Sequence, residues 1–445
     1  MSILSKLAHE CGCQILHGSC YEVAHTWEPE CYKAFLVAVP AALRYSLKTY
    51  GLFYFIATMV AKKDPRKVDW KRYIRDTIQS SCFLTMNLVL YLFFICRLRA
   101  VLGFFTPFTY GGLSSMLASF FALMVEKKSR RPALALYLAN LASETLYRQA
   151  VHHGYMFRMK YGECVPFAGG LMLFMYLYSQ GRLSDSLKNF LSITHKLEPS
   201  KEIINSTKLP TAFQEFLYDL RTQYPKSEKC DHDHSCVSVA GEAFVKNFSV
   251  GFGISSALLL IRNLKNVFTK PTKVLSAIFS SSNMKIPLFF GLMPFLFHAS
   301  RCTMNHHTDL PDSVKNISSI AFSSVSMAVS PNVTIAMYTL WKGIEAWYCD
   351  MADRGKLPYV PHGDHLIYTF ATGYVLWMAI LEPHAIRKGY QNFLMGLTDK
   401  RLSLLNRSLI DHWGFQSSKI FPYTPTLDTK HCSINPMLYQ PIKPT

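Results

Sequence analysis

Charged side chains are scarce in this chain and are missing altogether from several long stretches. Only 17% of the 445 residues are Asp, Glu, Lys or Arg, against about 25% in soluble domains. Four stretches contain none of them: Val101–Val125, Cys164–Gln180, Asn316–Trp341 and His365–Leu381. Because a helix needs about 20 apolar residues to cross a bilayer core, the pattern predicts an all-α, multi-pass helical membrane protein.

Signatures of common enzymes are also absent. The chain has no P-loop, no GxGxxG fingerprint and no HExxH motif. No serine or cysteine in a recognisable nucleophile signature accompanies the histidines near His306 or His362. We therefore expect a protein that is not an enzyme, with no catalytic residues and no cofactor. No two glycines are four residues apart, which excludes a strict GxxxG helix-packing motif.

Acidic residues are fewer than basic ones, and the formal net charge is +18. In a soluble protein this excess would suggest nucleic acid binding. Here the Lys and Arg residues gather in short segments beside apolar blocks, as at 62–75 and 127–131. That bias is typical of membrane proteins and suits anionic headgroups. We expect the lipid bilayer and anionic lipid headgroups as partners, and no nucleic acid.

The apolar blocks fall into two sets separated by a polar stretch. The stretch contains an amphipathic run, Phe213–Tyr224, that we expect to form a surface helix. The predicted organisation is a cysteine- and histidine-bearing head (1–31), a first membrane-helix repeat (32–181), a polar linker (182–241), a second membrane-helix repeat (242–387) and a surface tail (388–445). The fold expected is therefore two related helical halves joined by a polar linker.

The second half repeats residues of the first at an offset of 201 positions. The offset pairs Ala135 with Ala336, Tyr137 with Tyr338, Glu144 with Glu345, Tyr147 with Tyr348, Gly154 with Gly355 and Gly162 with Gly363. It also carries the fifth apolar block, beginning at Cys164, onto the last one, beginning at His365. Duplicated helical units that pack about a pseudo-axis are common in channels and carriers.

Each copy of the repeat places one acid among apolar residues. Tyr137, Glu144 and Tyr147 share a helix face, and Arg148 lies one turn after the acid, where it can pair with it. In the second copy Tyr338, Glu345 and Tyr348 repeat this face, with Lys342 as the nearby base. An ionisable group inside a membrane needs a partner or a wet cavity. One interpretation is a polar translocation path, and the other is a pair that locks helices together.

Cysteine and histidine clusters are the only metal-like features. The strongest is Cys230, His232, His234 and Cys236, although strict alternation is not a usual zinc-finger spacing. The alternative is a polar loop that enters a helix, and our expectation is no metal. The head presents a second group, for which metal binding, redox pairing and simple packing all remain open: Cys11, Cys13, His17, Cys20, His25 and Cys31.

Several segments resemble one known family. The run Cys20–Cys31 is similar to the N-terminal cysteine-rich signature of the transmembrane protein 135 family, also called peroxisomal membrane protein 52. Further similar segments follow in order along the chain: Glu126–Arg131, Tyr137–Arg148, Phe248–Gly251, Phe268–Ser276 and Gly355–Asp364. The resemblance covers nearly the whole chain, and it supplies no catalytic residues.

The resemblance implies a multi-pass protein of mitochondrial and peroxisomal membranes. It implies a role in the balance of mitochondrial fission and fusion, through promotion of a dynamin-related GTPase, and in peroxisome organisation and lipid homeostasis. It also implies a distant similarity to the Tim17/Tim22/Tim23/PMP24 group, although the missing GxxxG motif departs from that group's glycine-rich helix packing. The alternative function is a carrier or translocase-like transporter of lipids or metabolites built from the duplicated halves.

Overall fold

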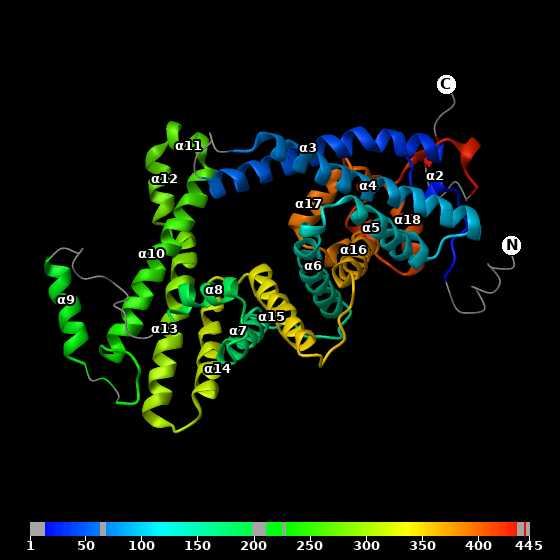
Figure 1. Cartoon of the computed structure of the whole chain (residues 1–445). Helices are drawn as coiled ribbons and strands as arrows, with labels where there is room; N and C mark the ends of the chain where they lie inside the picture. Colours follow the sequence, from blue (N-terminus) through cyan, green and yellow to red (C-terminus); the bar gives the residue numbers. More distant parts are fainter. Residues whose placement is uncertain are drawn as a thin grey trace. The chain divides into compact units, whose positions relative to one another are not determined.

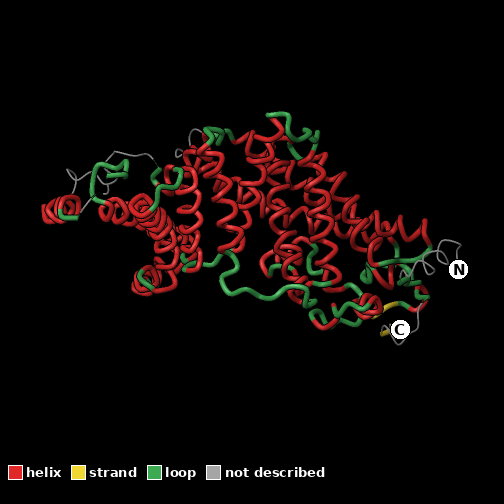
Figure 2. Tube along the Cα trace, turned by 90° about the horizontal axis from the view of Figure 1, so that it is seen from below, coloured by secondary structure: helices red, strands yellow, loops and turns green. Residues whose placement is uncertain are grey.

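The computed structural model describes residues 14–62, 68–197, 211–224, 226, 228–433 and 440–441. The described chain is almost wholly helical, and its two strands have two residues each (Figure 2). It forms two compact units: unit 1 comprises Met1–Phe157 and Val360–Thr445, and unit 2 comprises Arg158–Tyr359. The predicted all-α class is confirmed. The repeat boundaries at 181 and 242 stay a prediction, because the units are defined by packing rather than by sequence.

Unit 1 is built around an antiparallel hairpin of two long helices (Figure 1). Asp69 caps the second helix by accepting from Arg72 N, and the left-handed Gly103 ends it. The unit's helices are α2 (Cys20–Val23), α3 (Cys31–Lys62), α4 (Trp70–Leu102), the π-helix η2 (Phe108–Leu113), α5 (Ser114–Val125), η3 (Lys128–Arg130), α6 (Arg131–His152), α16 (Gly363–Leu381), η6 (Pro383–Ala385), α17 (Lys388–Leu397), η7 (Arg401–Leu404), α18 (Arg407–Ile410), η8 (Asp411–Trp413), η9 (Ser417–Lys419) and η10 (Thr429–His431). Strand β1 (Thr426–Leu427) pairs in parallel with β2 (Gln440–Pro441).

Unit 2 contains a second long hairpin, α10 with α13 (Figure 1). Ser235 and Ser280 cap its two helices through their side chains. The unit's helices are α7 (Cys164–Ser179), α8 (Asp185–His195), α9 (Thr211–Thr222), α10 (Cys236–Arg262), α11 (Leu264–Thr269), α12 (Pro271–Ile278), α13 (Ser281–His307), α14 (Asp312–Ser323), η5 (Ser324–Ala328) and α15 (Val333–Asp353).

Three helical segments among the described residues are long and apolar enough to cross a bilayer. They are Trp70–Leu102, Phe108–Val125 and Cys236–Arg262. The last of these buries only 17% of its most apolar window, and its exposed side chains include Ile254 and Ile261. Exposed apolar helix faces of this length match a hydrocarbon environment. The chain is therefore an all-α membrane protein.

The final helix of each half packs in the opposite half's unit. In chain order the halves run α3, α4, α5, α6, α7 and α10, α13, α14, α15, α16. Helix α16 packs on α5 and α6 in unit 1, whereas α7 packs on α14 and α15 in unit 2. Both units thus contain the same five helices of the repeat, with the fifth exchanged between halves.

The loops that lead to the exchanged helices have the same backbone conformation at the predicted offset. Gly154 and Gly355 both have positive φ, 78° and 67°, directly after α6 and α15. Tyr161 and His362 follow with φ of 59° and 58°. Each loop also returns to the last turn of the preceding helix: Met156 N donates to Ala150 O, and 201 positions later Leu357 N donates to Met351 O. This recurrence confirms two related halves.

The charge-free stretch Val101–Val125 is divided between two helical segments, because α4 ends before Gly103 and η2 begins at Phe108. One prediction about the chain's organisation is wrong. Residues 388–445 do not simply lie at the surface: Ile410 and Trp413 belong to a core of unit 1, and Arg407 is fully buried. The Arg407 guanidinium is held by the Ile380 and Leu402 carbonyls, whose bonds keep it from being a bare buried charge.

The polar linker contributes to unit 2 as well as to its surface. Helix α9 forms where an amphipathic run is predicted. Helix α8, by contrast, packs Leu191 into a core of the unit and buries His195 beside Phe297. The linker is therefore partly an element of the fold.

Candidate metal centres and membrane acids

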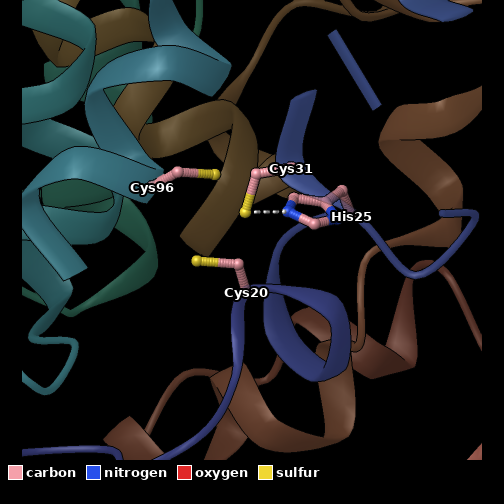
Figure 3. Close-up of side chains that lie close together, drawn as sticks. All are labelled: Cys20, His25, Cys31 and Cys96. Carbon is pink, nitrogen blue, oxygen red and sulfur yellow. Dashed lines mark hydrogen bonds between the residues drawn. The ribbon is translucent and has the colours of Figure 1, made fainter. Parts of the chain in front are cut away.

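Three cysteines and one histidine converge at the open end of the α3–α4 hairpin in unit 1. Cys20 opens α2, His25 follows on a loop, Cys31 is the first residue of α3, and Cys96 lies near the end of α4. One ligand atom from each lies within 4.8 Å of all the others. His25 Nε2 is 3.3 Å from Cys31 Sγ, and the three sulfur atoms and the ring face one another (Figure 3).

Polar contacts hold the loop that carries Cys20 and His25. Arg99 Nε donates to Gly18 O at 2.7 Å, and Tyr110 donates through its hydroxyl to Val23 O. A capping box joins Ser19 and Glu22 at the start of α2. The buried Glu22 carboxylate also accepts from the backbone and side chain of Ser433. The C-terminal residues therefore help to fix this cluster.

Electrostatics in this first cluster favour a thiolate. Hydrogen bonds from Cys20, then Cys96 and His25, lower the pKa of Cys31. Burial lowers the pKa of His25, but its bonds to Cys20 and Cys31 outweigh burial and raise that pKa to about 10. The thiolate is the form of cysteine that binds metals.

Unit 2 contains a second cluster of the same composition at the open end of the α10–α13 hairpin. Cys230 and His232 lie on the preceding loop, Cys236 is the first residue of α10, and Cys302 lies near the end of α13. His232 Nε2 is 3.3 Å from Cys302 Sγ, and the sulfur atoms of Cys230 and Cys236 are 3.9 Å apart. Burial lowers the pKa of His232, which favours the neutral imidazole that metals bind.

Neighbouring polar groups position the second cluster. Asn305 Nδ2 lies 3.7 Å from Cys230 Sγ, and Arg301 pairs with Asp231 at 3.3 Å. Ser235 Oγ donates to Leu220 O at the end of α9. Burial raises the pKa of the Cys230 thiol, so in this cluster a thiolate needs a further partner.

The sequence analysis found these clusters only in part. Of its candidates, Cys230, His232 and Cys236 come together, but His234 contributes only a backbone carbonyl to the cluster. Cys302 is the fourth member instead. In the head, Cys20, His25 and Cys31 are joined by Cys96, while Cys11 and Cys13 lie outside the described residues. The missing signal was the internal repeat, because Cys31 precedes Cys96 by 65 residues and Cys236 precedes Cys302 by 66.

The two membrane acids have different surroundings. Glu144 is buried, with Arg148 Nη2 2.5 Å from its Oε1 and Arg387 Nη1 3.6 Å from its Oε2. Glu345 is 37% exposed at its side chain and pairs only over one turn with Lys342, at 2.6 Å. Both pairings follow the predicted spacings, but the surroundings do not repeat. The transport role of these acids stays a prediction.

The tyrosines of the predicted polar face have mixed positions. Tyr137 and Tyr338 are 40% and 50% exposed. Tyr147 donates to Phe157 O at 3.4 Å, and Tyr348 donates to Pro358 O at 2.9 Å. Since each bond spans ten residues, these two tyrosines fasten the loop that follows their helix.

One polar cluster in unit 1 has no counterpart in the sequence analysis. The buried carboxylate of Glu382 accepts from Gln149 and lies 3.1 Å from His153 Nε2. His384 Nε2 is 3.6 Å from the same carboxylate, and its ring packs on that of His152 at 3.9 Å. Burial lowers the pKa of His384, and the neighbouring His152 lowers it further. The cluster fixes the end of α6 to the end of α16.

Fold and clusters together define a multi-pass helical membrane protein with a cysteine-rich region at its N-terminal end. Residues 17–151 match the model of the N-terminal cysteine-rich region of transmembrane protein 135. Over these residues the chain is similar to the transmembrane protein 135 family. No solved structure matches it. The matched region contains all four residues of the first cluster: Cys20, His25, Cys31 and Cys96.

Proposed function

We propose that this chain is a multi-pass protein of mitochondrial and peroxisomal membranes that regulates the balance of mitochondrial fission and fusion. In this proposal it promotes a dynamin-related GTPase and also serves peroxisome organisation and lipid homeostasis. Support comes from the family match over residues 17–151 and from the membrane architecture. The proposal includes no catalytic step, and the chain acts as a membrane organiser.

Helix α9 is the observation that best supports a docking role. Its residues Phe216 and Tyr218 are 59% and 68% exposed, beside the exposed acids Glu215 and Asp219. The opposite side of the helix buries Leu217. An acidic and aromatic surface of this kind suits a protein partner, because aromatic side chains supply much of the energy of protein interfaces.

A buried ion pair holds α9 in place. Arg221 binds the Glu242 carboxylate of α10 through two nitrogens, at 2.7 and 3.0 Å, and both side chains are nearly inaccessible to solvent. Such a bidentate pair has a fixed geometry. The exposed face of α9 is therefore presented by an anchored helix, which lowers the entropy that a partner's binding would cost.

Substitution of the exposed face of α9 tests this proposal. Deletion of the whole linker would also remove α8, which packs into a core of unit 2. The F216S/Y218S variant should reach the same organelles at the same level but lose its effect on mitochondrial length. Tyr359→Ser, at another highly exposed aromatic of unit 2, is the matched control and should behave as the unmodified chain. If F216S/Y218S still changed mitochondrial length as the unmodified chain does, α9 would not be a docking site. Imaging against mitochondrial and peroxisomal markers tests the proposed location in the same cells.

The carrier alternative has weaker support. It requires an equivalent buried acid in each half. Only the carboxylate of Glu144 is buried, whereas that of Glu345 is partly exposed. A pair of acids related by a pseudo-axis would be expected to share their environments. We therefore favour the organiser over the carrier.

A further inference from the structure

Both cluster histidines direct the same ring nitrogen at the sulfur atoms. His25 Nδ1 lies 2.7 Å from Glu28 O, and His232 Nδ1 lies 2.6 Å from His234 O. A carbonyl oxygen can only accept a hydrogen bond, so Nδ1 carries a hydrogen in each ring. Nε2 is then the atom that faces the thiols. Metal-binding histidines are oriented in this way, by donating their second ring nitrogen to a carbonyl or carboxylate.

The distances between the ligand atoms match a tetrahedral zinc site. With Zn–S bonds of about 2.3 Å and Zn–N bonds of about 2.0 Å, neighbouring ligands lie roughly 3.5–3.8 Å apart. The corresponding distances are 3.3 Å in the first cluster and 3.3 and 3.9 Å in the second. Each group of four ligand atoms fits within 4.8 Å.

Packing alone gives little reason for these groups to converge. Thiols are weak hydrogen-bonding groups, so three of them around one imidazole gain little from one another. Yet the same set occurs at the same place in both hairpins: one cysteine begins the first helix and another lies near the end of the second. Two segments of different spacing, Cys20–Cys31 and Cys230–Cys236, each supply two cysteines and one histidine, and the second helix of the hairpin supplies the third cysteine.

We propose that each half of the chain binds one Zn²⁺ ion in a closed Cys3His site, formed by Cys20, His25, Cys31 and Cys96 in unit 1 and by Cys230, His232, Cys236 and Cys302 in unit 2. Three thiolates and a neutral imidazole are a donor set typical of structural zinc. On binding, the three cysteines and the histidine of each site together release three protons to solvent, so that three thiolates and a neutral imidazole remain, and no redox step occurs. The ion joins the start of one long helix to the end of the next and so closes the hairpin.

Metal content of the purified, detergent-solubilised full chain tests the proposal. Elemental mass spectrometry should find two zinc ions per chain. Cys96→Ser and Cys302→Ser should each remove one ion, and the double variant should remove both. The control C82S/C349S replaces two exposed cysteines outside the clusters and should retain two. A folded chain without zinc, or with iron or copper in its place, would overturn the proposal.

A second pair of variants separates metal loss from misfolding. His25→Cys offers a fourth thiolate and should keep both ions, whereas His25→Ala should keep only the ion of unit 2. Likewise, His232→Cys should keep both ions, whereas His232→Ala should keep only the ion of unit 1. Substitution with Co²⁺ should give the visible absorption of a tetrahedral thiolate site. Mapping of Cys20–Cys31 or Cys230–Cys236 disulfides in the native chain would contradict the zinc sites.

Discussion

Unit 1 and unit 2 place the same four ligands at the open end of their long hairpins, but they treat their membrane acids differently. The two sets of ligands come from loops of different length and still converge. The acids keep their position in the repeat, yet Glu144 is enclosed by two arginines and Glu345 pairs with one partly exposed lysine. A duplicated chain retains the contacts that both copies need. The comparison therefore assigns the clusters a role in each half and Glu144 a role in one.

A close helix crossing in unit 2 sharpens this comparison and should give the largest effect. A Cβ on Gly170 of α7 would lie 2.5 Å from the backbone of Thr339 in α15, whereas the equivalent residue of unit 1 is already Ala371. Gly170→Ala must push the helices apart and should lower the free energy of unfolding by about 3 kcal/mol. Thermal unfolding of the full chain in detergent measures it.

Gly253 provides the control for this glycine. A Cβ there meets no atom within 4 Å, so Gly253→Ala should stabilise α10 by up to about 1 kcal/mol through helix propensity. Equal effects of the two substitutions would contradict the close crossing of α7 and α15.

The next largest effect is the loss of stability on replacing the acids, which should differ between the two halves. Glu144→Gln removes the buried negative charge that Arg148 and Arg387 contact. The expected loss in the free energy of unfolding is about 1–3 kcal/mol. Glu345→Gln removes a partly exposed pair, and its loss should stay below about 1 kcal/mol. Similar losses measured in the same unfolding assay would mean that the two acids are equivalent after all.

The last prediction concerns lipid binding, rather than stability, at the connection between α10 and α13. A pocket of about 230 Å³ there is lined by Asn263, Asn266, Lys270 and Lys273, with two apolar residues. Lysines at a membrane surface attract anionic lipids by about 1 kcal/mol each. The variant K270Q/K273Q should therefore retain several-fold less anionic phospholipid after purification, as measured by lipid mass spectrometry. The variant K188Q/K356Q changes two other exposed lysines of unit 2 and should retain the usual amount; equal retention by both variants would argue against the pocket.

Much of the fold follows from local features of the sequence. Of the three candidate spans, the charge-free blocks of the sequence contain only Phe108–Val125, because Trp70–Leu102 and Cys236–Arg262 include charged residues. The 201-residue offset predicted two halves, because a duplication can be found by comparing the sequence with itself. The end of α4 at Gly103 was missed, since a single glycine within an apolar block does not by itself reveal a left-handed turn. Burial of Arg407 was missed because its carbonyl partners, such as Ile380, belong to other segments.

The clusters show the same limit. Cys230, His232 and Cys236 are neighbours in sequence and were noticed as a group. Cys96 and Cys302 become ligands only when a long helix returns antiparallel to the start of its hairpin, which no local pattern encodes. The absence of GxxxG was likewise a poor guide to helix packing, because single glycines at 170 and 343 permit the close crossing of α7 and α15.

Exchange of the fifth helix between halves is the central claim, and cysteine cross-linking in membranes tests it most directly. The ideal Cβ of Gly373 lies 3.3 Å from Met116 Cβ, and that of Gly343 lies 3.2 Å from Leu173 Cβ, close to the spacing of a disulfide. Upon mild oxidation of a C82S/C349S chain, M116C/G373C and L173C/G343C should each cross-link. If each half instead kept its own fifth helix, the pairs displaced by the repeat offset, M116C/M172C and G343C/Y374C, would cross-link in their place.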